Sequence, residues 1–358
     1  MAKEDAAVKN REIFEHLQKG SNYFLITNLK NIQFITGFSG DWAVLLLSKN
    51  RTHLLTDSRF TEQAGKETTK CNIITIKKPF TSYLKTLIKK RKKIAFESAH
   101  LHYELYRKIK RSLSGRSFIP VSGIIERLRM FKTSAEIQKI SKAAKIADLA
   151  FSKILGFIKV GVREIEIASE LEYILRSNGS TAHPFPTIAL TSTNSSLPHG
   201  QPGMRKIKMG DLFLLDFGAT YKGYVSDITR TVVVGKTTKK QEKIYNIVLK
   251  AQMAAIKCIK PDMQLKELDK TARDIIIEAG YGENFGHGLG HGIGLEVHES
   301  PGVSFRSKDI VGNGMVFTIE PAIYIPEWGG VRIEDDIAIL NNRVKILTKS
   351  PKEKLIEV

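Results

Sequence analysis

Cysteine and long apolar runs are the two features that this chain of 358 residues most clearly lacks. Only Cys71 and Cys258 occur, which excludes a disulfide framework and a cysteine-ligated zinc site and fits a reducing cytoplasm. No stretch approaches the roughly 18 apolar residues of a membrane-spanning helix. The first residues, MAKEDAAVKNREIF, contain no apolar core of a signal peptide. We therefore expect a globular cytoplasmic protein that has no contact with a membrane.

Acidic residues are also in short supply, since 37 Asp and Glu face 56 Lys and Arg and leave a net charge of +19. Such a balance occurs in nucleic-acid-binding proteins. Here, however, the basic residues are mostly lysine and are scattered along the chain. The densest run, KKRKK at 89–93, lies between an amphipathic segment and a strand-like one, where a solvated helix end explains it. We do not expect a nucleic-acid partner.

The first third of the chain alternates between strand-like and helix-like segments. This pattern predicts an α/β domain with a mixed sheet over residues 1–131. Residues 45–57 are typical of a hairpin whose turn lies near Lys49 and Asn50. The chain is long enough for a second domain, residues 132–358. The predicted strands of the first domain are 23–29, 42–48, 51–57, 71–77, 93–98 and 117–122.

Residues 132–358 indicate an α+β domain that contains an internal duplication. Two pairs of amphipathic helices begin near Ser134 and Lys239, and strands follow each pair. The two pairs match at a fixed offset of 101 residues, so that Gly280 after the second pair corresponds to Gly179 after the first. Such a repeat predicts two related halves with a ligand-binding cleft between them.

Two predicted hairpins carry acidic residues inside strand-like runs. Asp216 and Asp227 are equally far from a turn at Tyr221 and Lys222, which predicts that their carboxylates face each other. Glu320 and Glu334 are equally far from Glu327 and form a second pair in the same way. Facing carboxylates in an apolar sheet need a shared proton or a bridging cation.

The glycine-rich stretch GHGLGHGIGLEVHE, residues 286–299, supplies His291 to the same site. Its glycines predict a close approach of the backbone and room for a substrate. Four carboxylates and one imidazole suit two divalent cations, with Mn²⁺ preferred and Co²⁺, Fe²⁺ or Zn²⁺ possible. Two such ions would share a hydroxide nucleophile at neutral pH.

Further side chains are expected around these ions: His199, His287, His298 and Arg332. His287 lies four residues before His291, so both side chains point to one face of an extended segment. The histidines suit proton transfer or substrate binding. Arg332 lies two residues before Glu334 and shares its face, which leaves a structural ion pair and an active-site role both open.

Several motifs together resemble those of the creatinase/aminopeptidase superfamily with the pita-bread fold, and within it aminopeptidase P and Xaa-Pro dipeptidase (prolidase). These motifs are LLDFGATYKGYVSDITRT, GHGLGHGIGLEVHE, FTIEPAIYI and VRIEDD. The resemblance covers nearly the whole chain. It implies a creatinase-like N-terminal α/β domain, a catalytic pita-bread metallopeptidase domain and a homodimer.

The resemblance also implies residue roles and a reaction. The implied metal ligands are Asp216, Asp227, His291, Glu320 and Glu334. The implied substrate and transition-state residues are His199, His287, His298 and Arg332, and Glu320 also accepts a proton. The implied reaction is hydrolysis of the bond between an N-terminal residue and proline in small peptides. A methionine aminopeptidase, which usually lacks the first domain, and a non-catalytic pita-bread binding protein, which tends to lose ligands, remain the alternatives.

Overall fold

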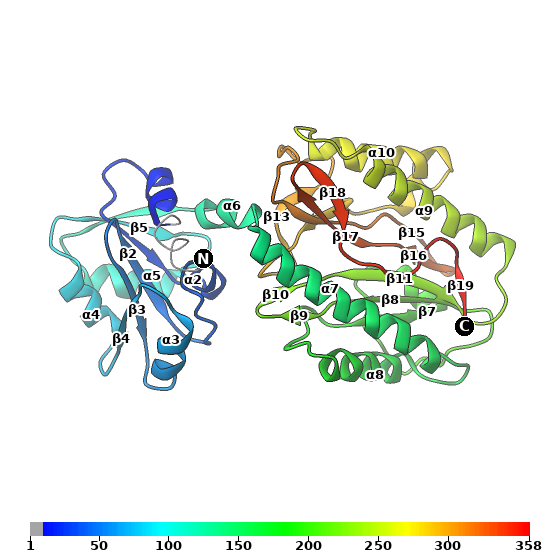
Figure 1. The fold of residues 1–358 in the computed structure, drawn as a ribbon, viewed down its shortest axis with the longest axis horizontal. Helices are drawn as coiled ribbons and strands as arrows, with labels where there is room; N and C mark the ends of the chain where they lie inside the picture. Colours follow the sequence, from blue (N-terminus) through cyan, green and yellow to red (C-terminus); the bar gives the residue numbers. More distant parts are fainter. Residues whose placement is uncertain (1–9) are drawn as a thin grey trace. The chain divides into compact units, whose positions relative to one another are not determined.

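The protein is described here by a computed structural model that covers residues 10–358 (Figure 1). The chain forms two compact units, an N-terminal unit that ends at Arg129 and a C-terminal unit that begins at Met130. This division lies two residues before the boundary expected from the sequence. Among the described residues, no helix combines the length and apolar character needed to cross a membrane.

The N-terminal unit is built on a six-stranded mixed sheet of order β4-β3-β2-β1-β5-β6. Neighbours among β1, β2 and β3 are antiparallel, and the other pairs are parallel. The predicted hairpin is confirmed, because Leu47 pairs with Thr52 across Lys49 and Asn50. The strands are β1 (Tyr23–Ile26), β2 (Val44–Ser48), β3 (Thr52–Thr56), β4 (Asn72–Thr75), β5 (Lys93–Glu97) and β6 (Ser117–Val121).

Short helices connect or follow these strands, and one of them has local sequence signals at both ends. The Asn28 side chain accepts hydrogen bonds from the backbone N–H groups of Lys30 and Asn31 and so caps α2, which ends at the left-handed Gly37. The helices are α2 (Leu29–Thr36), α3 (Thr61–Glu67), α4 (Phe80–Leu87), α5 (Tyr103–Ser112) and α6 (Ile124–Met130).

The C-terminal unit shows the predicted duplication. Helices α8 (Glu164–Ser177) and α10 (Leu265–Glu278) begin and end at positions that keep the offset of 101 residues. Each is preceded by a long helix, α7 (Ser134–Ile154) or α9 (Lys239–Cys258), and each of these begins with a capping box. In Figure 1 the two helix pairs lie on opposite sides of the sheets. Each pair packs its apolar side chains against a different sheet, so the unit has two related cores.

Two sheets of the C-terminal unit are large, with strand orders β19-β11-β8-β7 and β13-β12-β14-β17-β18. The first contains β7 (Ile188–Thr191), β8 (Leu212–Phe217), β11 (Ile228–Val233) and β19 (Ile356–Glu357). The second contains β12 (Gly290–Gly292), β13 (Glu299–Val303), β14 (Val316–Ile319), β17 (Asp335–Leu340) and β18 (Arg343–Ile346). Two short ribbons extend the hairpins: β9 (Thr220–Tyr221) with β10 (Tyr224–Val225), and β15 (Ala322–Ile325) with β16 (Gly329–Arg332). The 3₁₀ turns are η1 (Leu155–Phe157), η2 (Ser192–Ser196) and η3 (Gly282–Asn284).

The register of the first acidic hairpin differs from the prediction by two residues. Asp216 pairs with Thr229 and does not face Asp227. The turn is formed by Lys222 and Gly223, which both have positive φ, as a two-residue type I′ turn requires. Because side chains alternate with a period of two, this shift leaves both carboxylates on one face.

The second acidic hairpin has the predicted register. Ile325 pairs with Gly329 around the left-handed Glu327, and Ile319 pairs with Asp335 further along. Glu320 and Glu334 therefore lie opposite each other. At this point the ladder opens, because their backbone N–H groups do not bond across the hairpin but to other segments of the unit. The Glu320 N–H donates to the Leu289 carbonyl at 2.8 Å, and the Glu334 N–H donates to the Thr229 carbonyl at 3.1 Å. This opening turns both carboxylates toward the first hairpin.

Candidate metal centre and active site

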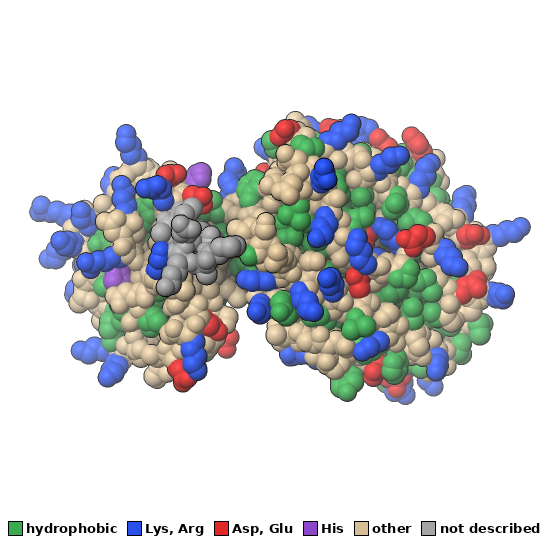
Figure 2. All heavy atoms as spheres, in the orientation of Figure 1, with side chains coloured by type: hydrophobic (Ala, Val, Ile, Leu, Met, Phe, Trp, Pro, Cys, Tyr) green, Lys and Arg blue, Asp and Glu red, His purple; other side chains and the backbone are tan. Residues whose placement is uncertain are grey.

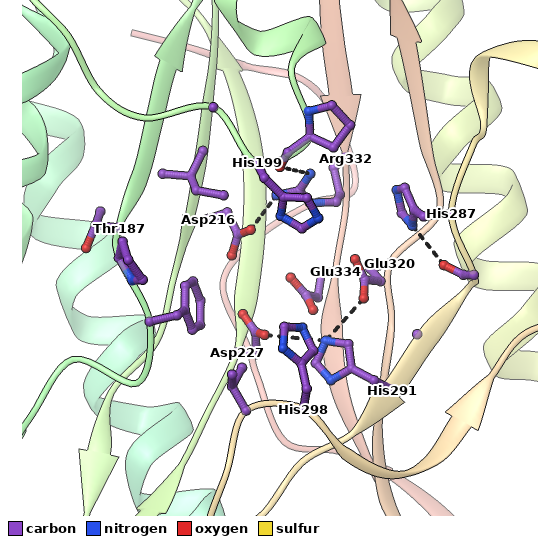
Figure 3. A pocket seen from close by; sticks show the side chains of 18 of the residues that line it. Thr187, His199, Asp216, Asp227, His287, His291, His298, Glu320, Arg332 and Glu334 are labelled. Atoms are coloured by element: carbon purple, nitrogen blue, oxygen red, sulfur yellow. Dashed lines mark hydrogen bonds and ion pairs between the residues drawn. The ribbon is translucent and has the colours of Figure 1, made fainter. Parts of the chain in front are cut away.

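A cavity of about 420 Å³ in the C-terminal unit is lined by every site residue predicted from the sequence (Figure 3). Strands β8 and β12 and the segments beside β11, β14 and β17 bring the acidic residues and His291 together. The other three histidines come from loops. The predicted residues that line it are His199, Asp216, Asp227, His287, His291, His298, Glu320, Arg332 and Glu334.

The glycines around His291 permit this arrangement because neighbouring backbone lies very close. A Cβ at Gly290 would lie 2.0 Å from the Thr318 carbonyl oxygen, and one at Gly292 would lie 2.2 Å from the Ser300 carbonyl oxygen. No larger residue fits either position without moving a strand. The glycine-rich stretch is thus explained by close packing on both sides of His291.

Three of the predicted metal ligands form a compact group. Potential ligand atoms of Asp227, His291 and Glu334 all lie within 4.8 Å of one another. His291 Nε2 lies 3.7 Å from Asp227 Oδ2 and 3.3 Å from Glu320 Oε1. One nitrogen and several carboxylate oxygens in this arrangement form a donor set that suits a divalent cation.

The electrostatics of the acidic residues also fit bound cations. Burial, followed by the charges of Glu334 and Asp216, raises the pKa of Asp227 well above its usual range. Burial, followed by the charges of Glu320 and Asp216, likewise raises the pKa of Glu334. Asp216 Oδ1 and Asp227 Oδ1 are buried and have no hydrogen-bond partner among the described residues. Divalent cations would satisfy these oxygens and remove the repulsion.

His291 and Glu320 stabilise each other in their charged forms. Burial alone would raise the pKa of Glu320, but the hydrogen bond and charge of His291 outweigh it and lower this pKa to about 2. Burial would lower the pKa of His291, and Glu320 raises it above its usual value. Because an imidazole ligates a metal in its neutral form, metal uptake at His291 releases a proton.

Arg332 is buried and is engaged by several partners. Its Nη2 donates to Asp216 Oδ2 and its Nη1 to the Tyr324 hydroxyl. Its Nε donates to Thr229 Oγ1 at 3.0 Å. Of the two roles left open by the sequence, this geometry supports an ion pair that fixes Asp216.

His199, His287 and His298 line the cavity around the compact group, and their ring nitrogens can form hydrogen bonds. The ring centroids of His298 and His291 lie 4.3 Å apart. His287 contacts the Gly288 carbonyl through Nδ1 at 2.8 Å and the Tyr324 hydroxyl through Nε2 at 3.2 Å. Burial lowers the pKa of His287 and of His298, which favours neutral rings.

Four residues of the site were not singled out from the sequence: Thr229, Thr318, Tyr324 and Asp336. The Thr229 hydroxyl donates to Glu334 Oε2 at 2.6 Å, and the Thr318 hydroxyl donates to Glu320 Oε1 at 3.3 Å. Asp336 Oδ2 accepts from the Asp227 N–H at 3.1 Å. Partners of this kind orient metal ligands. Each lies two or four positions from a predicted ligand. Side chains at such spacings share one face of a strand, and this periodicity could have identified them from the sequence.

A duplicated α+β unit whose central cavity gathers carboxylates and imidazoles defines a metal-dependent hydrolase. Comparison with known proteins makes this specific. Residues 138–341 match the model of metallopeptidase family M24, and residues 14–131 match the creatinase/prolidase N-terminal domain. The chain belongs to metallopeptidase family M24, so the predicted superfamily, fold class and enzyme class are confirmed.

Relatives and solved structures match over almost the full length. An Xaa-Pro dipeptidase of Pyrococcus horikoshii is 40% identical over 96% of this chain and 98% of its own. The structure of an Xaa-Pro dipeptidase from Bacillus anthracis has a TM-score of 0.94 at 43% identity and covers 99% of both chains. An X-Pro aminopeptidase from Thermotoga maritima has a TM-score of 0.89 at 39% identity, with 95% of this chain and 98% of that chain covered.

Proposed function

We propose that this metallopeptidase hydrolyses the bond between an N-terminal residue and a following proline. The observation that carries the proposal is one cavity that gathers four carboxylates, His291 and three further histidines. The full-length likeness to proteins named for Xaa-Pro substrates supports the prolyl specificity. The creatinase-type N-terminal domain favours this activity over methionine removal. The proposed ligands of two divalent ions, with Mn²⁺ preferred, are Asp216, Asp227, His291, Glu320 and Glu334.

Bound divalent ions would polarise the scissile carbonyl and lower the pKa of the attacking water. Glu320 holds the proton taken from that water and passes it to the leaving prolyl nitrogen. The prolyl amide has no N–H, so the site needs no acceptor for that atom of the substrate. His298 donates a ring N–H group to the developing oxyanion, His287 lines the substrate side of the cavity, and His199 holds the substrate from its loop. Tyr324 orients His287, because its hydroxyl contacts both His287 and Arg332.

Two further properties belong to the proposal. The resemblance to aminopeptidase P and prolidase supports a homodimer. The low cysteine content supports a cytoplasmic location. Size-exclusion chromatography with light scattering tests the first, and fractionation of the source cells tests the second.

The test uses metal-depleted protein to which Mn²⁺, Co²⁺ or Zn²⁺ is returned. The substrates are Ala-Pro, Ala-Pro-Ala-Ala, Met-Ala-Ala and Ala-Ala-Ala. We expect metal-dependent cleavage only of the prolyl peptides. Cleavage of Met-Ala-Ala alone would favour methionine removal instead. No cleavage and no bound metal under any condition would overturn the enzymatic proposal.

A further inference from the structure

We infer that this site prefers peptides that continue beyond proline over Xaa-Pro dipeptides. The inference rests on the proposed prolyl specificity and asks what lies on the carboxyl side of proline. Names do not decide the matter, because a dipeptidase and an aminopeptidase both resemble the chain closely. The chemical difference is that a dipeptide carries a carboxylate on its proline, whereas a longer peptide carries a neutral amide there.

The described residues that line the cavity offer a substrate carboxylate no free cationic side chain. Among the described residues that line it, Arg332 is the only arginine and lysine is absent. The acidic lining residues are the proposed metal ligands, whose charge bound divalent ions would neutralise: Asp216, Asp227, Glu320 and Glu334. A carboxylate that leaves water needs charge-assisted hydrogen bonds, most often from arginine or lysine. A site specialised for dipeptides therefore requires a cation that this lining does not offer.

Arg332 does not supply that cation. Only 3% of the residue is exposed, and its charge is paired with Asp216. Its other guanidinium nitrogens donate to Thr229, Tyr324 and the Pro198 carbonyl. Binding a substrate carboxylate here would require Arg332 to give up at least one of these partners.

The other lining side chains with N–H groups are mainly histidines, which offer ring nitrogens in place of the guanidinium of arginine or the ammonium of lysine. Neutral N–H groups suit a peptide carbonyl on the far side of proline. The apolar lining, which includes Phe185, Pro186 and Val297, also accommodates a continuing peptide.

The position where a cation could stand is occupied by glycine. Gly302 on β13 pairs with His291 on β12, so a side chain there would lie beside His291 on the same face. A Cβ at Gly302 would meet nothing within 4 Å, and its φ lies outside the left-handed region. The space on this side of the proposed ligand His291 is therefore open.

The first experiment compares kcat/KM of the Mn²⁺-loaded protein at pH 8 for Ala-Pro, Ala-Pro-amide and Ala-Pro-Ala-Ala. We expect kcat/KM for each of the two substrates without a carboxylate on proline to be at least about tenfold higher than for Ala-Pro. This factor corresponds to one charged hydrogen bond that the Ala-Pro carboxylate lacks in the site. Equal or faster cleavage of Ala-Pro would overturn the inference and leave the proposed function intact. Cleavage of none of the three would overturn the proposed function itself.

A variant that adds a positive charge at residue 302 tests whether a cation at this position would bind the substrate carboxylate. Gly302→Arg should raise the ratio of kcat/KM for Ala-Pro to that for Ala-Pro-amide by about tenfold. Gly156→Arg is the matched control, because it adds the same charge at an exposed glycine outside the cavity. Thermal unfolding shows whether both variants remain folded. An equal gain in both variants, or no gain in a folded Gly302→Arg, would contradict the inference that a local charge is missing.

Discussion

The Glu320 carboxylate lies 3.3 Å from His291 Nε2 and 3.3 Å from the Thr318 hydroxyl. If it carries the proton to the leaving nitrogen, Glu320→Gln should lower kcat by roughly 100- to 10,000-fold. Glu327→Gln makes the same chemical change at the exposed turn of this hairpin and should leave kcat unchanged. Metal content is measured in parallel. A Glu320→Gln protein that binds metal and keeps its kcat would refute the proton-transfer role.

Thr229 links two parts of the site through one hydroxyl. It donates to Glu334 at 2.6 Å and accepts from Arg332 Nε at 3.0 Å. Thr229→Val keeps the shape and removes both bonds, so we expect metal affinity to fall roughly 10- to 100-fold. Metal-competition titration measures this change, and Thr229→Ser should retain most of the affinity. Equal affinities in all three proteins would show that the hydroxyl does not orient Glu334.

At the residue scale, the sequence indicated which acidic residues belong to the site but not which side chains hydrogen-bond to them. Acidic residues inside apolar strands stand out because burial needs a reason, and all four line the cavity. Thr229 and Thr318 did not stand out because threonine is common in strands. Their role depends on which strand lies opposite, and that information is not local in the sequence.

At the scale of elements, the β9–β10 turn fixes where Asp216 and Asp227 lie. Gly223 has φ +81°, a conformation that is costly for alanine. Gly223→Ala should therefore lower the free energy of unfolding of the C-terminal unit by about 1 kcal/mol. Gly156→Ala, at a glycine without positive φ, should change it by less than about 0.5 kcal/mol.

The measurement can be confined to one unit because each contains a single tryptophan, Trp42 or Trp328. Urea unfolding of a Trp42→Phe background follows Trp328 and thus the C-terminal unit. Equal effects of the two glycine substitutions in this background would show that the turn does not require a left-handed residue.

The same turn explains which part of the fold was missed. Strand positions and the second hairpin followed from apolar runs and from the spacing around Glu327. The first hairpin was placed two residues out of register, because the predicted turn did not use the left-handed pair Lys222 and Gly223. The order of strands in each sheet and the opening of the ladder at Glu320 depend on long-range pairing, which local patterns do not encode.

At the scale of the whole molecule, 56 Lys and Arg against 37 Asp and Glu give a net charge of +19. Figure 2 shows Lys and Arg side chains dispersed over the visible face of both units, with Asp and Glu among them in many places. Nucleic-acid-binding surfaces instead concentrate basic residues on one face or stripe. This face therefore gives no support to the binding alternative, and the chemistry lies in the acidic cavity.

Bound metal should stabilise one unit and leave the other unaffected. All five proposed ligands belong to the C-terminal unit, where Asp227 and Glu334 are buried and repel neighbouring carboxylates. A ligand present at about 100 times its Kd adds about 2.7 kcal/mol to the stability of the state that binds it. Chelation should thus lower the Tm reported by Trp328 by about 5–10 °C.

The N-terminal unit provides the internal control for this measurement. Its Tm, followed through Trp42 in a Trp328→Phe background, should not respond to chelator. Glu334→Gln, which removes a proposed ligand and one of the repelling charges, should make the Trp328 signal insensitive to chelator as well. A chelator effect of equal size on both units would mean that the metal acts elsewhere. No effect on either unit would mean that these carboxylates tolerate one another without a cation, contrary to the repulsion expected from their burial.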